Sequence, residues 1–203
     1  AAGLGKIGQQ TKPKGGYDHE HRHTQLTVVG GGPAGLNAAY EAARLGLRVT
    51  LIDDQPELGG HLRSHTTSYH GYGEYSGLSG FDIARRLSEQ VSAQPNIELI
   101  QSATVFGAYE AGLLGVMQAK RLIHVRTQQL IIATGSYEYP PVFHNNDLPG
   151  VMLGSGVRRL LHLYGVKPGR RAVVVCHDEA GLALACELLD AGIKVAAVVD
   201  SRF

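Results

Sequence analysis

The sequence predicts an α/β fold: a mainly parallel sheet with an antiparallel meander, followed by a smaller, incomplete α/β domain. Three observations support this prediction. A glycine-rich turn at residues 30–35 joins an apolar strand to a helix, a second apolar strand ends in the aspartates of residues 53–54, and residues 171–200 repeat the same order. A strand, a crossover helix and a further strand in this order form a parallel pair.

Composition restricts the class of protein. The 203 residues leave room for one large domain or one and a half ordinary ones. Nineteen Lys and Arg against eighteen Asp and Glu give a net charge of +1, which provides no basic field for nucleic acid or an anionic membrane. No apolar run approaches the ~18 residues of a membrane span, and the N-terminus lacks the apolar core of a signal peptide. We therefore expect a cytoplasmic protein with no nucleic-acid partner and no membrane span.

The first predicted domain covers residues 25–140, after a lead-in segment at residues 1–24 that has no apolar period. Its glycine-rich turn joins a first strand to a helix, and a second strand follows; apolar spacing marks all three elements. These elements are a strand at Gln25–Val29, a helix at Leu36–Leu45 with Gly46 as its stop, and a strand at Leu47–Ile52.

The rest of this domain combines a long loop with a helix and further strands. Leu58–Gly80 is rich in Gly, Ser, His and Tyr without an amphipathic stripe, so we predict a surface loop. Short apolar stretches separated by glycines between Ala103 and Val125 are typical of an antiparallel meander. The remaining elements are a helix at Phe81–Ala93, a strand at Ile97–Gln101 and a buried strand at Gln129–Ala133.

A Pro- and Asn-rich stretch at residues 139–150 marks the predicted domain boundary. The second domain, residues 150–203, is predicted to be truncated. Its elements are helices at Gly156–Tyr164 and Glu179–Ala191 and strands at Arg171–Cys176 and Lys194–Val199.

The glycine-rich turn reads GGGPAG and fits the G-x-G-x-x-G pattern of Rossmann-like dinucleotide-binding folds. Gly30 allows the sharp turn, Gly32 leaves room for a diphosphate, and Gly35 lets the helix pack closely on the strand. The diphosphate then lies at the positive end of the helix, beside the main-chain N–H groups of a turn that also contains Pro33 and Ala34.

Two aspartates complete the candidate site. Asp53 follows the second strand, eighteen residues after Gly35, and Asp54 comes next. A carboxylate at the end of this strand accepts a hydrogen bond from a ribose 2′-hydroxyl. Its negative charge would repel a 2′-phosphate, which disfavours NADP.

The repeat at residues 171–200 is degenerate. Cys176, Asp178 and Gly181 stand at the three glycine positions of the first turn, and Asp200 stands near the place of the ribose-binding aspartate. A carboxylate at the start of the helix would face an anionic diphosphate, so we predict that no dinucleotide binds there.

No residue set predicts a catalytic or metal site within this chain. The alternating histidines of residues 19–23, and His61 with His65, come without Cys or carboxylate groups at ligand spacing, so we interpret them as solvated loop histidines. Cys176 and Cys186 form no C-x-x-C pair, and neither G-x-S-x-G nor H-E-x-x-H is present.

Several stretches carry a family resemblance. GGGPAG, LIDDQPELGG and LIIATGSYEYPP resemble the two-dinucleotide-domain flavoproteins, the family of thioredoxin and glutathione reductases. AAGLG and VFHNNDLPGVMLGSGVRRLLHLYGVKPGRRAVVV more closely resemble the α subunit of heterotetrameric sarcosine oxidase. They also resemble the large subunits of dye-linked proline dehydrogenase, opine oxidase and hydrogen cyanide synthase.

The resemblance implies a set of cofactors and partners. NAD is the first choice at the glycine turn, with FAD or ATP in some relatives. Substrate oxidation would occur at FAD in another subunit of the oxidase or dehydrogenase, and FMN would lie between subunits. Carried over by position, the residues that would hold the nucleotide are Gly30, Gly32, Pro33, Ala34, Gly35, Asp53, Asp54, Gly60, Arg63, Ala133, Thr134 and Gly135.

A full α subunit of this kind has a ferredoxin-like domain before these residues and an aminomethyltransferase-like domain after them. We therefore expect the chain to be a fragment that has no oxidase or dehydrogenase activity alone. One alternative is a self-sufficient FAD enzyme of the thioredoxin-reductase type, which requires a redox cysteine pair and a working second glycine turn. Another is a structural module with a vestigial nucleotide site, in which replacing Gly32 would not change nucleotide binding.

Overall fold

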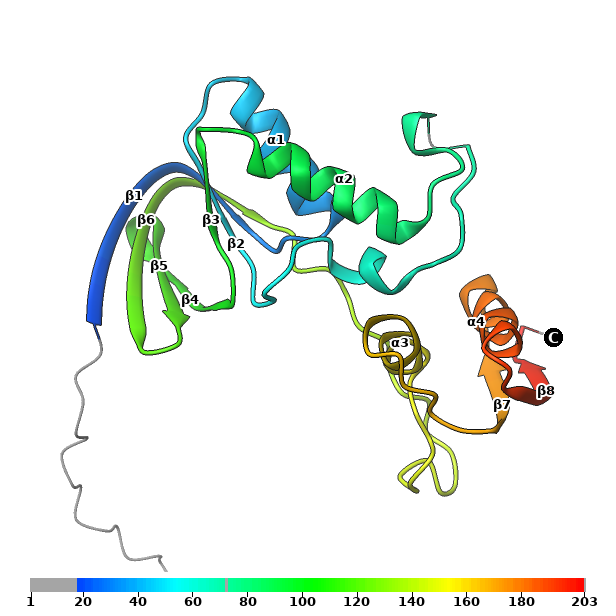
Figure 1. Cartoon of the computed structure of the whole chain (residues 1–203). Coiled ribbons are helices and arrows are strands. Elements are labelled where there is room, and N and C mark those ends of the chain that lie inside the picture. Colours follow the sequence, from blue (N-terminus) through cyan, green and yellow to red (C-terminus); the bar gives the residue numbers. More distant parts are fainter. Residues whose placement is uncertain (1–17, 72, 203) are drawn as a thin grey trace, which may run out of the picture.

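The computed structural model describes residues 18–71 and 73–202, and its main feature is a six-stranded sheet with the order β3-β2-β1-β6-β5-β4 (Figure 1). Strands β1, β2, β3 and β6 run parallel, and β4, β5 and β6 form the antiparallel meander. The sheet strands are β1 (Asp18–Val29), β2 (Val49–Ile52), β3 (Ile97–Ile100), β4 (Ala103–Tyr109), β5 (Leu113–Gln118) and β6 (Arg121–Ile132). The predicted α/β architecture is confirmed.

Strand β1 begins earlier than the sequence predicts. Residues 18–24, assigned to the lead-in segment, pair in parallel with residues 121–127 of β6. These residues have no apolar period, and their strand conformation depends on main-chain pairing with a distant segment. Ion pairs support it, because Arg22 contacts Glu98 of β3. Residues 1–17 lie outside the described residues.

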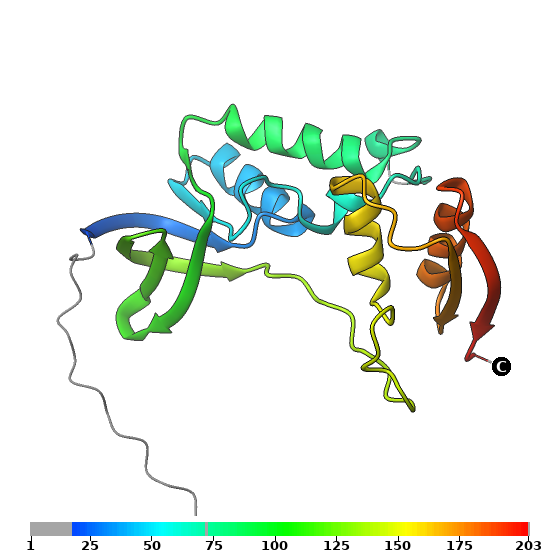
Figure 2. The same cartoon turned by 60° about the horizontal axis from the view of Figure 1, so that its bottom comes forward.

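Two helices, α1 (Pro33–Arg44) and α2 (Gly80–Ser92), cover one face of the parallel strands, and the meander lies against the other face (Figures 1 and 2). Successive residues of β2 show this division, since Leu51 packs with the helices and Ile52 packs with the meander. The main buried contacts on the helix side come from Leu26, Val28, Leu36, Ile83, Leu87 and Val91, and those on the meander side from Ile100, Leu114, Val116, Ile123 and Val125.

The segment between β2 and α2, predicted as one long loop, contains two short 3₁₀ helices. These are η1 (Gly60–Ser64) and η2 (Gly73–Tyr75), and an isolated bridge pairs Ser68 with Ser79. Ser79 also caps α2, because its side chain accepts a hydrogen bond from the main-chain N–H of Asp82.

The strand predicted at Gln129–Ala133 forms as the end of β6, but it is not buried. Ile131 is 37% exposed and Ile132 is 70% exposed. In this part of the sheet β6 pairs with β1 on one side, whereas β5 pairs only with residues 121–126. The apolar run therefore predicted the strand correctly and its burial wrongly.

Residues 171–200 form a second, smaller βαβ unit. Strands β7 (Arg171–Cys176) and β8 (Lys194–Asp200) are parallel, and α4 (Glu179–Asp190) packs on them. The helix predicted at Gly156–Tyr164 begins two residues earlier as α3 (Gly154–Arg158) and continues as a π-helical turn, η4 (Arg159–Leu163). The division into two domains near residues 140–150 stays a prediction. Among the residues described, no helix is both long and apolar enough to span a bilayer.

Candidate functional site

The glycine turn at the end of β1 packs closely against main chain at Gly30 and Gly35. Gly30 has a φ of 108° and donates its N–H to the carbonyl of Ile52 at 2.8 Å. A Cβ on Gly30 would overlap the carbonyl oxygen of Ala133, and a Cβ on Gly35 would overlap the carbonyl oxygen of Gly30. Gly30 therefore requires glycine because the main chain after β6 lies against it, and Gly35 requires glycine because helix α1 approaches the end of β1.

Gly32 lies in a different environment. It is the N-cap of α1, and a Cβ added to it would meet nothing within 4 Å. No side chain of the described residues caps α1, whereas Ser79 caps α2 and Asp178 caps α4. The start of α1 thus combines free main-chain N–H groups, a positive helix end and open space, which together suit a diphosphate.

Asp53 lies beside this turn. Its Oδ2 accepts a hydrogen bond from the N–H of Gly31 at 2.5 Å, and its Oδ1 accepts one from the N–H of Gln55 at 2.8 Å. Asp54 is exposed and accepts a hydrogen bond from the side chain of Gln55. A carboxylate has about four acceptor positions, so Asp53 can still accept hydrogen bonds from a ribose.

The segment after β2 forms one flank of the turn. Gly59 donates its N–H to the carbonyl of Gly31 at 2.7 Å, and a Cβ on Gly60 would lie 2.9 Å from the Cα of Gly32. Gly60 is therefore next to the start of α1, as the candidate site requires.

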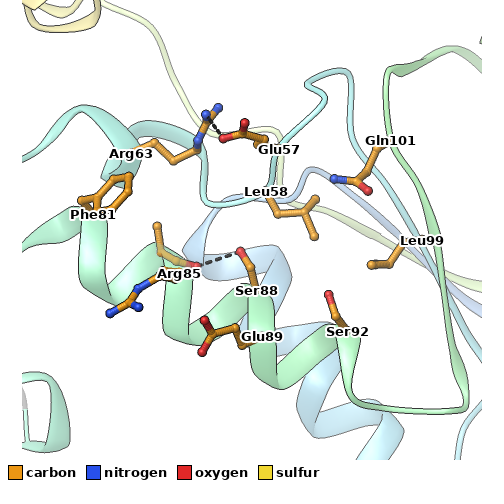
Figure 3. A pocket seen from close by; sticks show the side chains of 11 residues that line it. Glu57, Leu58, Arg63, Phe81, Arg85, Ser88, Glu89, Ser92, Leu99 and Gln101 are labelled. Carbon is orange, nitrogen blue, oxygen red and sulfur yellow. Dashed lines mark hydrogen bonds and ion pairs between the residues drawn. The ribbon is translucent and has the colours of Figure 1, made fainter. Parts of the chain in front are cut away.

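The side chain of Arg63 contacts Glu57 and not the glycine turn. It forms an ion pair with Glu57 and lines a hollow of about 370 Å³ beside α2, with Leu58, Phe81 and Leu99 as apolar lining (Figure 3). The side chain of Leu58 also closes on Gly31, where an added Cβ would lie 2.5 Å from Leu58 Cδ2. The hollow is thus separated from the glycine turn by Leu58.

Residues 133–136 form the opposite flank. Ala133 donates its N–H to the carbonyl of Val29 at 2.7 Å, while Thr134 and Gly135 are exposed beyond the end of β6. The ring of His61 reaches this flank, because its Nε2 lies 2.8 Å from the carbonyl oxygen of Ser136. From the sequence His61 is a candidate only for chelation, and no local pattern indicates this contact across 75 positions.

In the second copy of the turn, a side chain of the turn itself occupies the start of the helix. The carboxylate of Asp178 accepts a hydrogen bond from the N–H of Gly181 at 3.0 Å and so occupies the N-terminus of α4. A Cβ on Gly181 would overlap the Cβ of Cys176, so this glycine serves helix packing. Asp200 bonds to Arg202, whose hydrogen bonds hold the pKa of the Asp200 carboxyl below its ordinary value.

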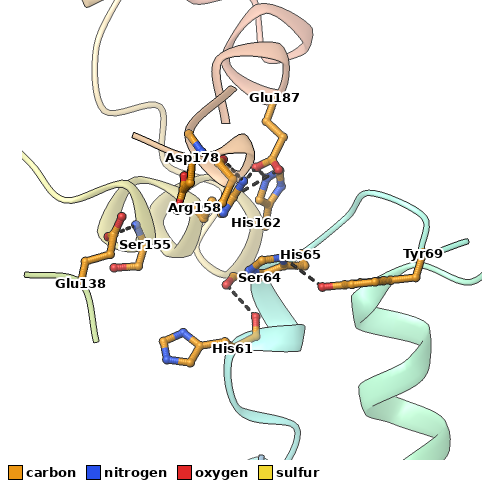
Figure 4. Close-up of polar contacts among 12 residues, drawn as sticks. His61, Ser64, His65, Tyr69, Glu138, Ser155, Arg158, His162, Asp178 and Glu187 are labelled. Atoms are coloured by element: carbon orange, nitrogen blue, oxygen red, sulfur yellow. Dashed lines mark hydrogen bonds and ion pairs between the residues drawn. The ribbon is translucent and has the colours of Figure 1, made fainter. Parts of the chain in front are cut away.

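A buried charged cluster joins α3 and η4 to α4 (Figure 4). Arg158 Nε lies 3.0 Å from Glu187 Oε2, and Nε2 of His162 lies 3.2 Å from the same oxygen. Arg158 also donates to the carbonyl of Ala180 at 2.9 Å. Nearby, the hydroxyl of Tyr69 lies 3.3 Å from Nδ1 of His65. Sequence patterns did not predict this cluster, because charged residues within a helix give no sign of burial.

The remaining histidine and cysteine candidates do not gather into a metal centre. His19 and His21 lie on strand β1, not in the predicted loop, and make edge-to-face ring contacts with His124 across β1 and β6. Within residues 18–71 and 73–202, no group of three or more His, Cys, Asp or Glu side chains could hold a metal ion. Cys176 is a buried free thiol and Cys186 an exposed one.

Comparison with known proteins gives consistent relatives. The chain is 36% identical to the sarcosine oxidase alpha subunit of Rhizobium meliloti (strain 1021) over 216 residues, which cover 100% of this chain and 21% of that protein. It is 31% identical to hydrogen cyanide synthase subunit HcnB of Pseudomonas aeruginosa, covering 86% of this chain and 38% of that protein. The chain thus spans between a fifth and two-fifths of these relatives' length.

Solved structures agree with the fold. The structure of L-proline dehydrogenase from P. horikoshii superposes with a TM-score of 0.80 at 25% identity, covering 90% of this chain and 36% of that one. Thioredoxin reductase of Lactococcus lactis superposes with a TM-score of 0.64 at 17% identity, covering 86% of this chain and 55% of that one, and shares the fold alone.

The sequence resemblance to sarcosine oxidase α subunits is thereby confirmed. A family model described as pyridine nucleotide-disulphide oxidoreductase matches residues 24–202, which include both βαβ units. The chain belongs to the pyridine nucleotide-disulphide oxidoreductase family.

Proposed function

We propose that this chain is the nucleotide-binding part of the α subunit of an amine- or amino-acid-oxidising flavoenzyme complex of the sarcosine oxidase type. The names of its relatives support this proposal, since the matching chains of sarcosine oxidase, opine oxidase and hydrogen cyanide synthase are all named as subunits. The other subunits of such a complex are the proposed partners. They would carry the FAD at which the substrate is oxidised, and FMN would lie between subunits.

The proposed ligand of the glycine turn is a dinucleotide, with NAD as the first choice and FAD as the alternative. One observation carries this proposal: α1 begins at Gly32 with open space and no capping side chain among the described residues, while α2 and α4 are capped. A diphosphate would supply the missing hydrogen-bond acceptors. The nicotinamide or flavin ring, when bound, would supply hydride-transfer chemistry that no amino-acid side chain provides.

The residues of this chain would bind and orient the nucleotide. The main chain of residues 30–35 would hold the diphosphate, and Asp53 would accept hydrogen bonds from the adenosine ribose with exposed Asp54 beside it. Gly60 and residues 133–135 would flank the ligand on the two sides. Arg63 would reach the nucleotide only after leaving Glu57, its partner in the structure.

A self-sufficient FAD enzyme of the thioredoxin-reductase type is the second candidate. Its fold is shared, as the thioredoxin reductase superposition indicates. Against it, Cys176 and Cys186 form no C-x-x-C pair, and the Asp178 carboxylate occupies the start of α4 where a second diphosphate would bind. A vestigial site is the third candidate, and it predicts that the turn binds no nucleotide.

Identification of the bound nucleotide tests the proposal. The purified chain is examined by absorbance spectroscopy, and any nucleotide released on denaturation is identified by mass spectrometry. Calorimetric titration with NAD and with FAD follows. Bound flavin absorbs at about 450 nm, a property of the cofactor. We expect NAD to bind in the titration, and the binding of neither dinucleotide would support the vestigial module.

A further inference from the structure

One side chain joins the two flanks of the glycine turn. The ring Nε2 of His61, on η1, lies 2.8 Å from the main-chain carbonyl oxygen of Ser136. A carbonyl oxygen only accepts hydrogen bonds, so Nε2 carries the hydrogen and donates it. The bond connects positions 75 residues apart.

Both ends of this bond belong to segments that contact the turn. Gly60, directly before His61, lies next to Gly32 at the start of α1. Ala133, three residues before Ser136, is the residue that a Cβ on Gly30 would strike. The His61–Ser136 bond therefore joins the segment that follows Gly60 to the segment that follows Ala133, which are the two flanks of the proposed diphosphate site.

The two flanking segments are not held equally well by other contacts. The carbonyl of His61 accepts a hydrogen bond from the hydroxyl of Ser64 at 3.0 Å, and Ser64 is buried (Figure 4). Past the end of β6, by contrast, Gly135 has a φ of 72° with open space around it, and Tyr137 is 90% exposed. The imidazole of His61 thus extends from a turn that Ser64 holds to exposed residues that lie before the next side-chain anchor, Glu138, which accepts a hydrogen bond from the N–H of Ser155 at 2.6 Å.

We propose that His61 is a positioning residue for the dinucleotide, a latch that orders residues 134–137 before the ligand arrives. This inference rests on the proposed function, because it assumes a dinucleotide at α1. Without this hydrogen bond, residues 134–137 become ordered only when the dinucleotide binds, and the entropy lost in ordering them weakens the binding. One lost hydrogen bond then corresponds to an affinity about three- to tenfold weaker, expressed mainly in faster dissociation.

Three variants of the full chain test the latch. His61→Phe keeps a ring and removes the donor, whereas His61→Gln keeps an N–H donor close to the position of Nε2. His70→Phe alters another exposed histidine of the same segment and serves as the matched control. Two measurements apply to each variant: hydrogen exchange of the amides of residues 134–137 without ligand, and the dissociation constant and dissociation rate of NAD and FAD.

We expect faster exchange at residues 134–137 and about three- to tenfold weaker binding for His61→Phe, with both restored by His61→Gln and unchanged in His70→Phe. Unchanged exchange in His61→Phe would show that the bond orders nothing and would overturn the latch. Faster exchange with unchanged affinity would overturn the positioning role. If the parent chain binds neither dinucleotide, the proposed function itself fails, and the exchange result separates that failure from the failure of the latch.

Discussion

The main-chain N–H of Gly31 donates to Oδ2 of Asp53 at 2.5 Å, and this hydrogen bond ties the glycine turn to the end of β2. The same carboxylate accepts the N–H of Gln55 through its other oxygen. Asp53 thus holds the shape of the turn even without a nucleotide. A ribose hydroxyl would add to these bonds and would not replace them.

Replacing Asp53 should therefore affect both stability and binding. We expect Asp53→Ala to lower the free energy of unfolding by about 1–3 kcal/mol and to weaken dinucleotide binding by a similar amount, because two main-chain donors lose a charged acceptor. Urea unfolding and calorimetry measure the two effects. Asp54→Ala, at an exposed neighbour, should leave stability within about 0.5 kcal/mol of the parent. Parent-like stability of Asp53→Ala would show that the bond to Gly31 contributes little.

Gly32 and Gly35 should respond differently to substitution. Gly32→Val puts its side chain into open space, so we expect a normally folded variant that no longer binds dinucleotide in calorimetry. Gly35→Ala would overlap the carbonyl of Gly30 and should lower stability by about 1–3 kcal/mol. Gly156→Ala, where a Cβ meets nothing within 4 Å, is the control for glycine replacement in a helix. Undiminished nucleotide binding by Gly32→Val would place the ligand elsewhere.

The buried pair of Arg158 and Glu187 gives a prediction about stability alone. Glu187→Leu leaves the guanidinium of Arg158 buried without its carboxylate, and we expect a loss of about 3 kcal/mol in urea unfolding. The double variant Arg158→Met with Glu187→Leu should be clearly more stable than this single variant, since no unpaired charge remains. Equal stability of the single and double variants would contradict this account.

The environment of His65 predicts an acid-dependent loss of stability. Burial lowers the pKa of His65, and the positive charge of Arg158 lowers it further, with smaller opposing and supporting effects from Glu187, His61 and His162. The unfolded chain then takes up a proton at a higher pH than the folded chain does. Stability should fall as the pH drops below the ordinary histidine value of about 6.5, until His65 is protonated in the folded state as well.

His65→Gln cannot take up this proton, so its unfolding free energy should depend less on pH below about 6.5 than that of the parent. Parallel urea titrations of the two proteins at a series of pH values make the comparison. Superimposable pH profiles would mean that His65 is not the responsible group.

Catalysis by this chain alone should be absent. The Asp178 carboxylate already fills the start of α4, where a second dinucleotide would bind. With FAD, FMN, NAD and an artificial electron acceptor added, we expect no turnover of sarcosine, proline or opines. Turnover proportional to the concentration of this chain, in a preparation free of other subunits by mass spectrometry, would favour the self-sufficient enzyme.

Local sequence signals predicted the elements that carry their own pattern. The apolar run before Gly30 and the alanines of α1 each reflect a face that is buried close by. Strands β7 and β8 form where their apolar runs predict them, although Val173, Val175, Val198 and Val199 are exposed. The conformation of residues 18–24 could not be predicted in this way, because their partners lie about a hundred positions away on β6. The burial of Glu187 and the contact of His61 with Ser136 likewise depend on tertiary packing, which single-sequence patterns do not encode.

The two copies of the turn separate the demands of architecture from those of ligand recognition. Gly35 and Gly181 are each the glycine that lets a helix close on its strand, and both copies retain it. Position 32 in the first copy faces open space, and its counterpart in the second copy is Asp178, which caps its own helix. A saturation scan scored for folding alone should therefore reject substitutions at 35 and 181 alike while tolerating many at 32. When the same variants are scored for nucleotide binding, substitutions at 32 should also be rejected, whereas substitutions at 178 should cause no additional loss. After an ancient duplication, the packing glycine would outlast the one that only a ligand needs.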